Sequence, residues 1–179
     1  MMTDCRQPVT TRLFTFFSAL LMLVTFAPAV QAKVTIAFYS HEFDGRFPHA
    51  FVKLEGTLEA TGQRIDQNFG FTALSDGPSL YMGWARGGID ISKPDYIAVS
   101  HRRFAFQITD AQYRAVVAKM VEWRDRPGKN YHIDKHNCVH FVAEMATLLG
   151  VKINAKSRYW RRPEAFLSEV LSLNPGLKP

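Results

Sequence analysis

The residues most suited to chemistry lie around Cys138, where a polar segment meets an apolar one. Asn137 precedes the cysteine and is a favoured N-cap, because its side-chain oxygen accepts a hydrogen bond from an unpaired N–H of the first helical turn. Apolar residues then recur at helical spacing up to Gly150, a typical helix stop. The pattern predicts a helix beginning at Cys138, whose dipole favours the thiolate, the nucleophilic form of cysteine.

Three roles for Cys138 are compatible with this pattern. It could be a nucleophile, or an inert thiol, since cysteine is among the most frequently buried residues. It could also bind zinc, because His132, His136 and His140 stand close to it in sequence and imidazole is a zinc ligand. His140 lies about 200° round the helix from Cys138, so we expect it to pack away from the active-site face. We place His132 and His136 in a loop at the rim of a groove.

The first 32 residues have the features of a secretory signal peptide. Arg6 and Arg12 form a positive region, residues 13–26 are apolar, and Ala32 is a small residue at the expected cleavage point. The apolar run is short for a membrane-spanning helix, which needs about 20 residues, and an uncleaved anchor is the alternative. We expect an exported protein, periplasmic or secreted, whose mature chain starts at about Lys33.

Cleavage would leave Cys138 as the single cysteine, because Cys5 is removed with the signal. A lone cysteine in an exported chain favours a reactive or intermolecularly paired thiol over an inert one. Residues 33–179 have the length of one domain. The net charge of +6 is spread along the sequence and suits a polyanionic cell envelope or a phospholipid surface, whereas no nucleic-acid motif accompanies it.

The mature chain has a pattern of strands followed by helices. Five segments are predicted strands: 34–39, 49–58, 64–72, 95–100 and 103–108. The second and third form a β-hairpin. Thr109 and Gln112 make a capping box for a helix that ends near Pro127, and further helices begin at Cys138 and Pro163. This order predicts an α+β domain with an antiparallel β-sheet packed against helices on one face.

Residues 73–93 are predicted to form a long loop that serves as one wall of the active groove. Loops of this length in a compact domain are usually functional. Tyr81 and Trp84 are too apolar for a freely solvated loop, so we expect one of them to contact substrate. The alternative is that these aromatic rings merely close the core.

The segment Asn137-Cys138-Val-His140-Phe-Val resembles the Asn-Cys-Glu-His-Phe-Val signature of lecithin:retinol acyltransferase-like proteins. These belong to the permuted branch of the NlpC/P60 papain-like superfamily. Tyr131 is similar to a tyrosine that this group often has before the cysteine, and Pro48-His49 running into a strand resembles its histidine segment. The resemblance implies a permuted papain-like fold in which His49 is the base for Cys138, and we assign Tyr131 to substrate binding.

The same resemblance implies a third polar residue that orients the imidazole from the second hairpin strand. If the hairpin turns near Thr61, His49 faces residues 72–75. Thr72, Ser75 or Asp76 could then serve, with Asn68 as a further choice, and a Cys-His dyad is the alternative.

These features together predict an exported cysteine hydrolase that cleaves an amide or ester through an acyl-enzyme, without a cofactor or metal. The expected substrate is a cell-envelope component, either a peptidoglycan peptide or a lipid, and peripheral contact with a membrane is compatible with the charge. A non-catalytic envelope binding module of the same fold and a zinc protein built on Cys138 are the alternatives. The sequence predicts no oligomeric state.

Overall fold

The protein is described by a computed structural model that covers residues 33–42, 47–75 and 77–178. The expected signal peptide and Asp76 lie outside these ranges. From Ala32 onward the chain forms one compact unit. No helix in the described ranges combines the length and the apolar character that a membrane span requires.

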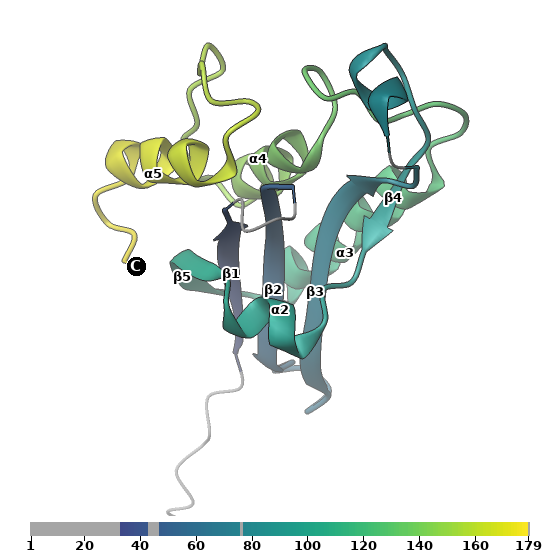
Figure 1. Cartoon of the computed structure of the whole chain (residues 1–179). Coiled ribbons are helices and arrows are strands. Elements are labelled where there is room, and N and C mark those ends of the chain that lie inside the picture. The colour runs from purple at the N-terminus through teal and green to yellow at the C-terminus, as the bar shows by residue number, and fades with distance from the viewer. Residues whose placement is uncertain (1–32, 43–46, 76, 179) are drawn as a thin grey trace, which may run out of the picture. The chain divides into compact units, whose positions relative to one another are not determined.

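An antiparallel five-stranded sheet is the centre of the fold (Figure 1). Its strands are β1 (Val34–His41), β2 (His49–Thr57), β3 (Arg64–Ala73), β4 (Gly87–Asp90) and β5 (His101–Ile108). They are arranged in the order β4-β3-β2-β1-β5. The predicted hairpin is therefore β2 and β3, and the prediction of an α+β domain with an antiparallel sheet is confirmed.

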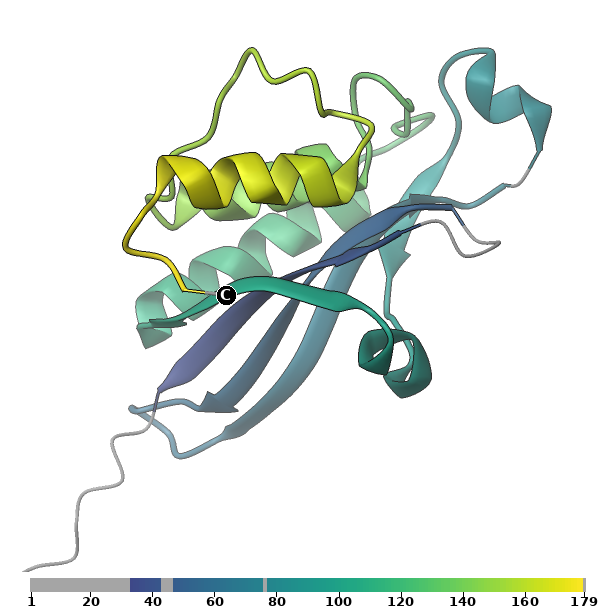
Figure 2. The same cartoon turned by 60° about the vertical axis from the view of Figure 1, so that its left-hand side comes forward.

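Four α-helices accompany the sheet, with a short 3-10 helix between β3 and β4. They are η1 (Pro78–Tyr81), α2 (Pro94–Ala98), α3 (Asp110–Asp125), α4 (Cys138–Leu148) and α5 (Pro163–Leu173). Figure 2 shows that α3, α4 and α5 cover one face of the sheet, while α2 lies against the other. The expectation of helices on one face holds for the three long helices only.

The prediction of a strand over residues 95–100 is wrong, because this stretch contains α2. Pro94 occupies the first turn, where its fixed φ suits a helix, and Asp95 adds a favourable negative charge there. The Ser100 hydroxyl donates to the Tyr96 carbonyl at 2.7 Å and closes the end of the turn. Strand β5 then begins at His101, two residues earlier than predicted.

Residues 73–93 are not one continuous loop, because they contain η1 and β4. Strand β4 pairs with the end of β3, with Asp90 opposite Gly70 and Gly87 opposite Ala73. A Cβ atom at Gly87 would lie 2.3 Å from the Phe71 ring, so only glycine lets the two backbones approach there. The segment is thus fixed at one edge of the sheet.

Side chains alternate between the two faces of β2, and this alternation decides where the site residues point. Ala50 and Val52 belong to the buried core shared with α4. His49 and Phe51 are on the other face, where the Phe51 ring meets that of Tyr96 on α2 at 6.1 Å. The first residue of β2 therefore directs its side chain away from the long helices.

Candidate active site

A pocket of about 600 Å³ lies at the end of the sheet where β2 begins and β3 ends. His49 and Cys138 both line it, together with Thr72, Tyr81 and Tyr131. The rest of its wall comes from the start of α4, the segment between β4 and α2, and the residues just before α5. Five of the predicted site residues thus share one cavity.

Cys138 is the first residue of α4 and is 8% exposed. Burial raises the pKa of its thiol from 9.0 to about 11, although nearby backbone N–H groups, that of Ala50 foremost, favour the thiolate. The helix therefore begins at Cys138 as predicted. Desolvation nevertheless raises the pKa of the thiol by more than the backbone N–H groups lower it. In this conformation Cys138 is a protonated thiol at neutral pH.

Asn137 holds the start of α4 with all of its side-chain hydrogen-bonding atoms. Its Oδ1 accepts from the N–H of Val139 at 2.8 Å and of His140 at 3.2 Å. Its Nδ2 donates to the carbonyls of Ile133 at 2.5 Å and Trp160 at 2.8 Å. The predicted N-cap is confirmed, and two backbone N–H groups at the start of α4 are bonded to it.

The imidazole of His49 lies over Gly70 on the neighbouring strand, where a Cβ atom would be 2.4 Å from Nε2. Its Nε2 is 3.8 Å from Oδ2 of Asp90 and has no hydrogen-bond partner among the described residues. Burial lowers the pKa of His49 from 6.5 to about 4, which Asp90 opposes and His41 reinforces. His49 is therefore neutral at pH 7.

Asp90 is the acidic residue that faces His49, and sequence reasoning missed it. The Ser92 hydroxyl donates to its Oδ2 at 3.3 Å. Asn68 fixes Ser92 in turn, because its amide accepts from the Ser92 N–H at 2.7 Å and donates to the Ser92 carbonyl at 3.1 Å. Of the predicted orienting residues, Asn68 is linked to Asp90 only through Ser92. Thr72 lines the pocket without a side-chain hydrogen bond to His49.

Cys138 and His49 share the pocket but do not touch through a hydrogen bond, and neither affects the pKa of the other. The thiol is in the core on the helix side of the sheet, whereas the imidazole is on the opposite side. The backbone of Ala50, whose N–H favours the thiolate, is bonded directly to His49. The thiol and the imidazole are thus on opposite sides of the sheet, although they lie next to adjacent residues of β2.

The predicted substrate-contacting aromatics have different positions. Tyr131 is half-buried in the pocket, and burial first, then Cys138, raises its pKa to about 12. Tyr81 lines the pocket and is 56% exposed. Trp84 does not line it, and its ring packs edge-on against His132 at 5.1 Å. Of the three predicted aromatics, the two tyrosines therefore line the pocket and Trp84 does not.

His136 was expected at the groove rim, but it is a buried residue that supports the loop before α4. Its ring stacks on Trp123 at 3.9 Å. Nδ1 is 2.6 Å from the Asn130 carbonyl, and Nε2 is 2.6 Å from Nη1 of Arg126. Because both ring nitrogens have protein partners, His136 is unsuited to bind zinc.

His140 packs as predicted, since its ring stacks on Trp160 at 4.5 Å and its Nδ1 is 2.9 Å from Asn137 Oδ1. Burial lowers its pKa to about 4. His132 is half-buried and its Nδ1 accepts from the Asp134 N–H at 3.1 Å. Among the described residues, no group of three or more His, Cys, Asp or Glu side chains could hold a metal ion.

Charged residues of both signs line the mouth of the pocket. Lys93 and Arg161 contribute positive charge, and Asp90 and Asp95 contribute negative charge. Arg161 is 3.5 Å from Asp134 in a half-exposed ion pair, which is worth little in water. The pocket can therefore accept a polar molecule that carries a carboxylate or an amine.

Comparisons of this chain with protein-family models, with curated protein sequences and with solved structures gave no significant match.

Proposed function

We propose that the protein is an exported cysteine hydrolase of permuted papain-like fold, with Cys138 as nucleophile and His49 as general base. The observation that carries this proposal is that both side chains line one pocket. The sulfur lies at a helix start, with the N–H of Ala50 favouring its thiolate. An α+β fold with an antiparallel sheet is compatible with the papain-like assignment, which rests on the sequence resemblance.

Catalysis requires the His49 imidazole to move from Asp90, round the start of β2, to the sulfur on the other side of the sheet. While the pKa values are about 4 for His49 and about 11 for Cys138, proton transfer from thiol to imidazole is strongly unfavourable. Close approach would lower the pKa of the thiol and raise that of the imidazole, because each charge stabilises the other. Nε2 loses no hydrogen bond in this movement, and catalytic contacts are often long in the free enzyme.

In the reaction the Cys138 proton moves to the imidazole, and the sulfur attacks the carbonyl carbon of the amide or ester. In this proposal the backbone N–H of Cys138 stabilises the resulting oxyanion, because the next two N–H groups are bonded to Asn137. The imidazolium then gives its proton to the departing amine or alcohol. Water, deprotonated by His49, releases the acyl group and restores the thiol.

The substrate in this proposal is a cell-envelope molecule, either a peptidoglycan peptide or a lipid. Full-length protein should be incubated separately with purified sacculi and with phospholipid, and the products identified by mass spectrometry. We expect release of one cleaved fragment by the wild type and none by Cys138→Ser. Equal release by both proteins, or none from either substrate, would oppose the proposal.

A non-catalytic envelope binding module is the second candidate function. The separation of thiol and imidazole by the sheet favours it, because the described conformation holds neither group in an activated form. A binding module should retain sacculi or lipid equally well in the wild type and in Cys138→Ser, with no product from either. Turnover by the wild type would eliminate this candidate.

A further inference from the structure

Large apolar side chains are exposed on the segments next to the pocket, and three of them, Phe47, Tyr81 and Ile91, line it. Six of the nine large hydrophobic residues that are exposed in the described ranges belong to this group. They are Phe47, Leu74, Tyr81, Met82, Trp84 and Ile91, and we call them the apolar rim. When large exposed apolar side chains concentrate in one region of a protein, they usually mark an interaction surface.

The most exposed part of the apolar rim is on a segment that projects from the domain. Figures 1 and 2 both show η1 extending beyond the end of the sheet. Met82, just after η1, is 86% exposed. Trp84 and Tyr81 have rings with a polar atom at one edge, the type of side chain that favours the boundary between water and lipid.

Positive charges predominate on the loop segments beside this projection, although Asp90 and Asp95 also line the pocket. Backbone hydrogen bonds of 2.9 Å join Ala85 to Tyr131 in both directions, and so place Arg86 beside the loop that carries Lys135. Arg161 reaches Asp134 of the same loop at 3.5 Å. Further exposed cations in the neighbouring segment before α5 are Lys156, Arg158 and Arg162. Asp134 is the only acidic residue of the loop from 126 to 137.

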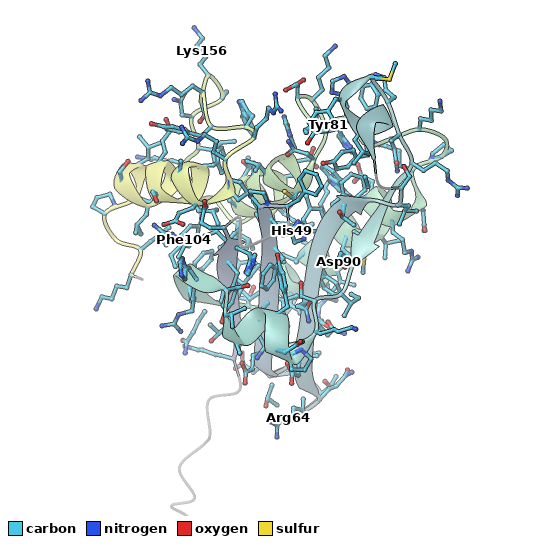
Figure 3. The ribbon with its side chains drawn as sticks, in the orientation of Figure 1. His49, Arg64, Tyr81, Asp90, Phe104 and Lys156 are labelled. Carbon is cyan, nitrogen blue, oxygen red and sulfur yellow. The ribbon has the colours of Figure 1, made fainter. Side chains whose placement is uncertain are left out.

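We propose that the apolar rim docks on an anionic lipid bilayer, with Tyr81, Met82 and Trp84 entering the headgroup region. The charge of the surrounding segments complements acidic phospholipid, and a bilayer accepts both exposed apolar groups and cations. Figure 3 shows Tyr81 and Lys156 at one end of the domain and Arg64 at the opposite end. Docking would turn the mouth of the pocket toward the membrane.

Insertion can be tested with the full-length chain and vesicles of phosphatidylglycerol and phosphatidylethanolamine that carry brominated acyl chains. Of the three tryptophans, Trp123 is buried and Trp160 is half-buried, so quenching should come from Trp84. We expect quenching in the wild type, and its loss in Trp84→Phe, although that variant still sediments with vesicles. Equal quenching in both proteins, or none in the wild type, would overturn the proposal.

The contribution of charge can be tested with Arg86→Gln and Lys135→Gln. Each should weaken binding to these vesicles by roughly fivefold at low salt, from the usual contribution of one basic residue near an anionic surface. Arg64→Gln, at the far end of the sheet, is the matched control and should bind as the wild type does. The first 32 residues are identical in all variants, so any difference in vesicle binding must come from the substitution in the described domain.

The proposal does not depend on catalysis, because Cys138→Ser should bind vesicles like the wild type. If that variant binds but no turnover is found, the proposed hydrolase is wrong and the docking surface stands. If Arg64→Gln weakens binding as much as Arg86→Gln, the docking surface is wrong. Retention on sacculi without binding to vesicles would also overturn it, and would indicate the polyanionic wall as the partner.

Discussion

His49 and Asp90 face each other across β3, with Nε2 and Oδ2 3.8 Å apart. Gly70, the β3 residue between them, has no side chain and leaves the space that the imidazole occupies. This arrangement uses three neighbouring strands and turns His49 away from α4. We interpret this as the resting position of the His49 side chain, in which the imidazole faces the Asp90 carboxylate and not the Cys138 thiol.

Asp90→Asn should lower the pKa of His49 below about 4, by roughly one, because the carboxylate is the group that raises it. The His49 imidazole can be titrated by NMR in both proteins. Asp95→Asn is the control, since Asp95 lines the same pocket but does not affect the pKa of His49. An unchanged or higher pKa in Asp90→Asn would contradict the stabilisation of the charged imidazole by Asp90.

Gly70→Ala should increase the reactivity of Cys138. The added Cβ would lie 2.4 Å from Nε2 and would displace the imidazole from its position near Asp90. Overpacking of this kind costs about 1–3 kcal/mol, enough to favour the conformer turned toward the sulfur by roughly tenfold. We expect faster alkylation of Cys138 at pH 7, and loss of the gain when His49→Ala is added. If the gain persists in the double variant, the imidazole is not its cause.

The sequence alone predicted the sheet, the hairpin and the helix at Cys138, because each depends on local periodicity and capping. Asn137 illustrates this, since a cap is made by neighbours in the chain. Asp90 could not be found in this way, because its strand has four residues and contains two glycines. Its position beside His49 arises only when β4 pairs with β3, a relationship that no spacing in the sequence encodes.

The direction of the His49 side chain was also inaccessible from the sequence. The resemblance placed histidine and cysteine in one pocket, which they share. Which face of β2 carries the imidazole depends on the register with β3 and on the room at Gly70. His136 was misplaced for a related reason, because its burial depends on Trp123 and Asn130, which contact it only in the folded chain.

Asn137→Ala should destabilise the fold by about 2–4 kcal/mol, since it removes a helix cap and leaves two part-buried carbonyls without their donor. Thr109→Ala removes the exposed cap of α3 and should cost only about 1 kcal/mol. Urea unfolding of both variants provides the comparison. A cost for Asn137→Ala no greater than that for Thr109→Ala would mean that the side chain does not hold the start of α4.

Stability should fall as pH rises from 9 to 11, because the thiol of Cys138 ionises in the unfolded chain at about 9 but in the folded protein only at about 11. At pH 10.5 this group should cost about 2 kcal/mol relative to pH 8. Tyr131, whose pKa burial raises to about 12, adds a loss above pH 10. Urea unfolding under reducing conditions should show a shallower alkaline decline for Cys138→Ser than for the wild type. Parallel declines would mean that the thiol is not desolvated.

The pH dependence of Cys138 alkylation tests the nucleophile and its base most directly. Iodoacetamide labelling should be followed by mass spectrometry on the Cys138 peptide of the full-length chain, so that Cys5 does not contribute. We predict an inflection below pH 8 in the wild type, from the conformer in which His49 ionises the thiol. In His49→Ala only the inflection near pH 11 should remain, as burial of the thiol dictates. A single inflection near pH 11 in both proteins would contradict the assignment of His49 as the base for Cys138.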